Sequence, residues 1–81
     1  MKKMFSITEL NPGDRARIGS LLSVNKLHLR KLTVFGILPG VEIELLQTSP
    51  TYVLRVEHTQ LALDFEIAKN IFVWKQENIK N

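Results

Sequence analysis

Proline and glycine divide this sequence into short segments. Asn11-Pro12-Gly13-Asp14 and Leu38-Pro39-Gly40 each combine a proline, which presets φ, with a glycine that can adopt a positive φ. Ser49-Pro50-Thr51 marks a third turn. Turns at these intervals favour short strands joined by tight connections.

Apolar and polar side chains alternate within most of these segments, as they do in strands with one buried face. The alternation predicts strands over residues 14–20, 41–46, 52–57, 61–63 and 71–74. About five strands this short favour a small barrel over an open sheet, because closure removes exposed strand edges. The predicted fold is therefore mainly β: a small SH3-like barrel of about five short antiparallel strands with one inserted helix.

The inserted helix is predicted between Asn25, a good N-cap residue, and Gly36, which suits a left-handed C-cap. At 100° per residue, one broad arc should face the core and cover one end of the barrel. This arc holds His28, Leu29, Leu32 and Phe35. Leu27 and Val34 form a second, narrower apolar stripe outside it, among Lys26, Arg30 and Lys31.

The predicted core joins the inner faces of these strands to the helix. Its members are Ile18, Leu32, Phe35, Val41, Ile43, Leu45, Leu54, Val56, Leu61, Leu63, Ala68, Ile71 and Val73. Two single helical turns complete the pattern, one holding Ile7 and Leu10 behind a Ser6 or Thr8 cap and one capped by Asp64.

Length and composition indicate one domain, because 81 residues with 44% hydrophobic side chains suffice for a single core. Residues 1–75 are assigned to it and residues 76–81 to a frayed C-terminal tail. The absence of cysteine excludes disulfides, thiolate metal sites and cysteine nucleophiles. No signal-peptide h-region and no membrane-spanning run are found, so we expect a cytoplasmic protein.

The polar residues offer little support for catalysis. His28 lies on the core arc of the helix, where a structural role is favoured over metal ligation. Glu57 and His58 are adjacent, and they could share a metal only if a turn brought them together. His28, Glu57 and His58 are therefore weak candidate metal ligands, and we expect no enzymatic activity and no cofactor.

The sequence also gives little support for nucleotide or nucleic acid binding. The four glycines do not follow phosphate-binding loop spacing. Arg15 and Arg17 on one strand and the basic residues of the helix could contact nucleic acid. A net charge of +3, with acidic residues interspersed, makes ordinary solvated faces the simpler interpretation.

Several short motifs resemble the ferrous iron transport protein A (FeoA) family. Arg30-Lys31-Leu32 followed by Phe35-Gly36-Ile37-Leu38-Pro39-Gly40 is similar to the family's basic helix and its following turn. The blocks Leu10-x-x-Gly13, Val41 to Leu46, Ser49-Pro50, Leu61 to Leu63 and Glu66 to Val73 follow in family order. The resemblance covers roughly residues 5 to 74.

The resemblance implies an SH3-like cytoplasmic accessory protein of ferrous iron uptake that docks on a FeoB-type membrane permease and modulates it. The same module also ends some iron-dependent repressors, so a repressor-like or nucleic-acid-binding domain is the alternative function. Direct metal sensing ranks third.

Two surfaces are candidates for partner binding. The first is the outer side of the helix and the turn after it: Lys26, Leu27, Arg30, Lys31, Val34 and Leu38. An apolar centre with a charged rim is typical of interfaces. The alternative is that Leu27 and Val34 pack on the loop from Leu21 to Val24.

The second candidate surface is the pair Phe72 and Trp74. Strand alternation turns both aromatic side chains outward, because Ile71 and Val73 point inward. They are either an exposed interaction patch or a satellite cluster covered by Met4, Phe5 and Ile7.

Overall fold

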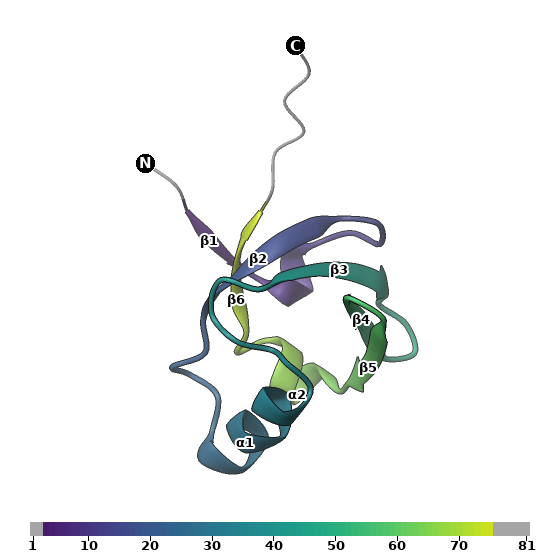
Figure 1. Ribbon diagram of the computed structural model, residues 1–81. Coiled ribbons are helices and arrows are strands. Elements are labelled where there is room, and N and C mark those ends of the chain that lie inside the picture. Colours follow the sequence, from purple (N-terminus) through teal and green to yellow (C-terminus); the bar gives the residue numbers. More distant parts are fainter. Residues whose placement is uncertain (1–2, 76–81) are drawn as a thin grey trace.

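The computed structural model describes residues 3–75 as six antiparallel strands with three short helices (Figure 1). The strands are β1 (Met4–Ser6), β2 (Arg15–Ser20), β3 (Glu42–Gln47), β4 (Tyr52–Val56), β5 (Thr59–Leu63) and β6 (Phe72–Lys75). The helices are η1 (Ile7–Glu9), α1 (Lys26–Val34) and α2 (Phe65–Ala68). The mainly β class is confirmed. No helix of these residues is long and apolar enough to cross a membrane.

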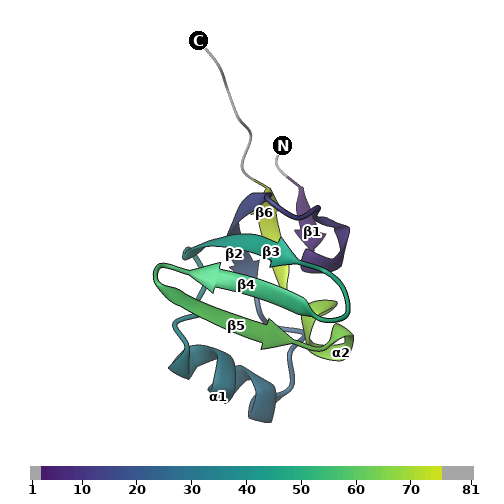
Figure 2. The ribbon, with the colours of Figure 1, turned by 90° about the vertical axis from the view of Figure 1, so that its right-hand side faces the viewer.

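The strands form one sheet in the order β1-β6-β2-β3-β4-β5, which leaves β1 and β5 at its two edges. Figure 2 shows the sheet curving so that β6 and β2 lie behind β3, β4 and β5. The start of β1 and the end of β6 lie on one side of the domain, whereas α1 lies on the opposite side (Figure 1). The predicted tail, residues 76–81, lies outside the described residues.

The structure adds one strand to the predicted set. There are six strands instead of about five, because Met4–Ser6 pairs with β6 in the register Met4 to Trp74. Three residues are too few for alternation to be recognised in a sequence. The helix lies between the two segments predicted to flank it, residues 14–20 and 41–46, which are β2 and β3 once β1 is counted.

Both ends of α1 are fixed by the predicted residues. The Asn25 side chain accepts a hydrogen bond from the backbone N–H of His28 at 2.9 Å. At the other end, Gly36 adopts φ 86°, and its N–H donates to Thr33 while the Ile37 N–H donates to Leu32. This pair of bonds is the Schellman motif, which satisfies carbonyl groups at the helix end.

The core is close to the predicted one, with one clear error. Phe35 is 39% exposed, because the helix ends at Val34 and Phe35 is already the C-cap residue. Val41 is only half-buried against the core. The other eleven predicted members are buried, and six further buried hydrophobic residues were missed: Ile7, Leu10, Ala16, Leu21, Val24 and Ile37.

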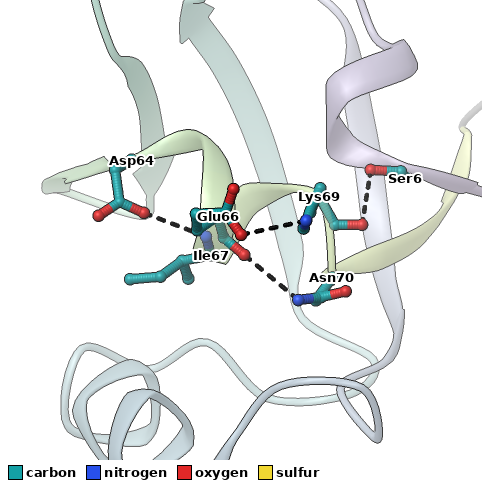
Figure 3. Close-up of polar contacts among 6 residues, drawn as sticks. All are labelled: Ser6, Asp64, Glu66, Ile67, Lys69 and Asn70. Atoms are coloured by element: carbon teal, nitrogen blue, oxygen red, sulfur yellow. Dashed lines mark hydrogen bonds and ion pairs between the residues drawn. The ribbon is translucent and has the colours of Figure 1, made fainter.

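Hydrogen bonds join the two short helices across the N-terminal segment. Ser6 caps η1 and its hydroxyl also donates to the Lys69 carbonyl at 3.0 Å (Figure 3). Asp64 caps α2 by accepting from the Ile67 N–H at 3.1 Å (Figure 3). Asn70 donates to the Glu66 carbonyl, which closes the chain after α2. These bonds fix the connection between β5 and β6.

Candidate docking surface

Helix α1 carries apolar side chains on two opposite sides. Leu32 is 1% exposed and anchors the inner side in the core, whereas Leu27 and Val34 are each 78% exposed. Leu27 and Val34 are seven residues apart, so they lie almost in line along the helix. At 100° per residue, both lie about 140° to 160° from Leu32. The second stripe is therefore the side of the helix that points into solvent.

Positive charge surrounds this stripe. Lys26, Arg30 and Lys31 are all exposed, and α1 contains no acidic residue. No ion pair to these three side chains is found among residues 3–75. Leu38, which follows the helix, is 43% exposed. We call Lys26, Leu27, Arg30, Lys31, Val34 and Leu38 together the α1 surface.

The loop before α1 does not cover this surface. Leu21 and Val24 are 6% and 7% exposed and belong to the core, while Leu27 and Val34 remain open. Packing of Leu27 and Val34 on this loop, the alternative left open by the sequence, is therefore not observed. The loop instead adds Leu22, which is 95% exposed and was not among the predicted site residues. The sequence pair Leu21-Leu22 could have indicated an exposed leucine, because neighbouring residues seldom point to the same side and only one of the two can then be buried.

Phe72 and Trp74 are both half-buried. Met4 pairs with Trp74 across β1 and β6, and both side chains cover Gly19. A Cβ atom at Gly19 would lie 2.7 Å from Met4 Sδ and 2.9 Å from Trp74 Nε1. At Trp74 this packing favours a satellite cluster over an exposed aromatic patch.

The three candidate metal ligands are not gathered into a site. His28 is half-buried on α1, whereas Glu57 and His58 form the exposed turn between β4 and β5. Glu57 takes a positive φ of 55°, so the turn that a shared metal would need is present. Residues 3–75 nevertheless contain no group of three or more histidine, aspartate or glutamate side chains placed to hold a metal ion.

A shallow groove of about 420 Å³ lies on the outer face of β2, β3 and β4. Its charged lining residues are Arg15, Glu42, Glu44, Arg55 and Glu57. Arg15 lies 4.0 Å from Glu42, and Arg55 forms an ion pair with Glu44. These opposite charges offset each other, so the groove does not present one sign of charge to a ligand.

Comparison with solved structures identifies the fold. An iron uptake regulatory protein, FeoA, superposes with a TM-score of 0.79 at 24% identity, covering 91% of this chain and 99% of that one. FeoA of Stenotrophomonas maltophilia, solved with zinc, gives a TM-score of 0.71 at 26% identity, covering 83% and 86%. That protein is described as a prokaryotic SH3 domain protein and a candidate ferrous iron transport activating factor. The predicted SH3-like fold is thus confirmed.

A longer protein contains the same domain. IdeR of T. acidophilum superposes with a TM-score of 0.84 at 26% identity, covering 90% of this chain. This chain spans only 34% of IdeR. No curated protein sequence matches the chain. The FeoA domain family matches residues 5–75, nearly all of the sequence. The chain therefore belongs to the FeoA domain family.

Proposed function

We propose that this protein is a non-catalytic accessory module of ferrous iron uptake that docks on the cytosolic region of a FeoB-type permease and modulates it. Membership of the FeoA domain family supports the association with ferrous iron transport. The observation that carries docking is the α1 surface, where Leu27 and Val34 are each 78% exposed between cationic side chains. Large apolar side chains left open in this way typically mark interaction sites.

The α1 surface suits docking because it is held rigidly. Leu32 anchors α1 in the core, and Asn25 and Gly36 fix its two ends. A preorganised surface loses little conformational entropy on binding. The cations should mainly raise the association rate, whereas Leu27 and Val34 should mainly slow dissociation.

Two double variants test this assignment. Leu27→Ser with Arg30→Ser removes one apolar and one basic side chain from the α1 surface. Lys3→Ser with Met4→Ser removes the same two kinds of side chain near Trp74, at the other end of the domain (Figure 1). Binding to the purified cytosolic region of the permease is measured by calorimetry, together with the melting temperature of each variant.

The proposal predicts that the α1 variant loses most of its affinity, at least about tenfold for a central interface pair, with little change in melting temperature. The Lys3 and Met4 variant should bind as the parent does. Loss of binding only in the Lys3 and Met4 variant would instead assign docking to the Trp74 side. No binding by the unmodified protein would contradict the proposed function.

The similarity to IdeR supports a second candidate, a regulatory domain of the repressor type that acts on nucleic acid. Acidic residues are absent between Asp14 and Glu42, a stretch that includes Arg15, Arg17 and the cations of α1. Nucleic acid binding should weaken steeply with salt, since each neutralised phosphate contributes a slope of about −0.9 in log K against log salt. A titration of duplex DNA at two salt concentrations distinguishes the two functions.

A further inference from the structure

Strand β5 is an edge strand without the usual protection against pairing. Natural edge strands are blunted by charged side chains, proline, bulges or short length. β5 contains only Thr59, Gln60, Leu61, Ala62 and Leu63, and it pairs with β4 over all five residues without a register shift. The other edge, β1, is only three residues long. Of the two sheet edges, the outer edge of β5 is therefore the longer one at which another strand could pair.

The register shows which backbone groups face outward. Val56 and Thr59 flank a two-residue turn, so they form a mutually hydrogen-bonded pair. Hydrogen-bonded and non-hydrogen-bonded pairs alternate along an antiparallel ladder, so Gln60 and Ala62 direct their N–H and C=O groups away from β4. Both residues are exposed, and within residues 3–75 no turn, loop or cap backbone bond reaches them.

The position of α1 decides what can occupy this edge. In Figures 1 and 2, α1 lies beyond β5 in the direction from β3 through β4 to β5. Figure 1 shows α1 displaced to the inner side of the curved sheet, so it is not directly in line with the edge. Pairing of β5 with β5 around a two-fold axis would bring a whole second domain to the side on which α1 lies. A single extended segment needs only the room of one strand.

The surroundings of the edge indicate the chemistry of that segment. Residues 59–63 carry no charged side chain, and the nearest charges lie beyond the two ends of the strand, at Glu57 and Asp64; this matches a segment that is uncharged where it pairs. Phe65, which follows Asp64, is 53% exposed. Phe35, which is 39% exposed, lies near the other end of the strand. The next residue, Gly36, is close to Val56 beside the β4–β5 turn, because a Cβ atom at Gly36 would lie 3.9 Å from Val56 Cγ1. Exposed phenyl groups thus lie near both ends of the edge.

We infer that the outer edge of β5 binds an extended, uncharged and partly apolar segment of a partner protein by strand addition. In this mode backbone hydrogen bonds at Gln60 and Ala62 supply affinity, and side-chain contacts supply selectivity. The site uses residues other than those of the α1 surface and does not depend on docking to a permease.

The test uses a macrocyclic peptide with one exposed strand of alternating threonine and valine, titrated into the ¹⁵N-labelled protein. Ala62→Pro removes the outward N–H while leaving the β4 ladder intact, because proline is tolerated at an edge position whose N–H faces solvent. Ala62→Thr keeps the N–H and is the matched control. Gln60→Lys adds a charge to the edge and is the second test variant, used if the proline variant fails to fold.

The expected result is that the peptide slows hydrogen exchange at the Gln60 and Ala62 amides by about tenfold or more. Affinity should fall by about tenfold or more in Ala62→Pro or Gln60→Lys, and should be retained in Ala62→Thr and in the Leu27 and Arg30 double variant. Equal binding by folded Ala62→Pro, or shifts confined to α1, would overturn the inference. Protection of both amides without peptide, accompanied by dimers in sedimentation, would identify a second copy as the occupant and overturn it too.

Discussion

Replacing one leucine on each side of α1 by alanine separates packing from docking. Leu32 and Leu27 are in the same helix and lose the same atoms on substitution. Leu32 is 1% exposed, whereas Leu27 is 78% exposed. Leu32→Ala therefore opens a cavity in the core, and Leu27→Ala removes atoms that are already in contact with water.

The expected magnitudes differ widely. Replacing a buried leucine by alanine lowers the free energy of unfolding by roughly 2 to 5 kcal/mol, depending on how far the cavity collapses. A domain of this size has a total stability near the low end of about 5 to 15 kcal/mol. Each kcal/mol lowers the melting temperature by roughly 4 to 8 °C, so Leu32→Ala should lower it by at least about 8 °C. Leu27→Ala should stay within about 0.5 kcal/mol of the parent.

Thermal and urea denaturation followed by circular dichroism measure both variants against the parent. If Leu27→Ala destabilises the protein as much as Leu32→Ala does, Leu27 is a packing residue and the outer side of α1 is not free to dock. If Leu32→Ala melts like the parent, α1 is not anchored through Leu32 and the orientation of the helix is wrong.

Four further outcomes are expected. Asn25→Ala should cost about 0.5 to 2 kcal/mol, because its side chain accepts the His28 N–H, and a smaller loss in denaturation would mean the cap is not formed. Gly19→Ala should cost about 1 to 3 kcal/mol, since the new Cβ would meet Met4 and Trp74, and unchanged stability would contradict that packing. Glu57→Gly should raise stability by up to about 1 kcal/mol by relieving the positive φ of 55°, whereas a loss would show that the Glu57 side chain stabilises the turn. Elemental analysis after dialysis against chelator should find no stoichiometric metal, and one retained equivalent would contradict this and direct attention to His28, Glu57 and His58.

Much of the fold could be predicted from local signals in the sequence. The turns at Pro12-Gly13 and Pro39-Gly40 and the caps Asn25 and Asp64 depend on neighbouring residues alone, and the structure has all four. Alternation located the inner residues of β3, β4 and β5 because one face of each strand is buried.

The failures involve features that local patterns do not encode. β1 is recognisable only through its pairing with β6, which is 68 residues away in the register Phe5 to Val73. Phe35 was assigned to the core by helical periodicity, but the periodicity stops where Gly36 ends the helix. Ile37 takes the buried position instead, as the residue after the left-handed glycine.

Sequence patterns identified the apolar residues of the candidate site but not whether other segments cover them. A second apolar stripe on α1 follows from the residue order, so Leu27 and Val34 could be named. Whether a loop covers them depends on the path of residues 21–24, which sequence patterns did not reveal. Similarly, strand alternation turned Trp74 outward but left open whether Met4 would cover it, which depends on the pairing of β1 with β6.

The most direct test of docking through the α1 surface is an NMR titration of the ¹⁵N-labelled protein with the purified cytosolic region of the permease. We predict that the largest amide shift changes fall on Lys26, Leu27, Arg30, Lys31 and Val34, with smaller changes at Leu38. Shift changes centred on Phe72 and Trp74, with α1 unaffected, would contradict the account.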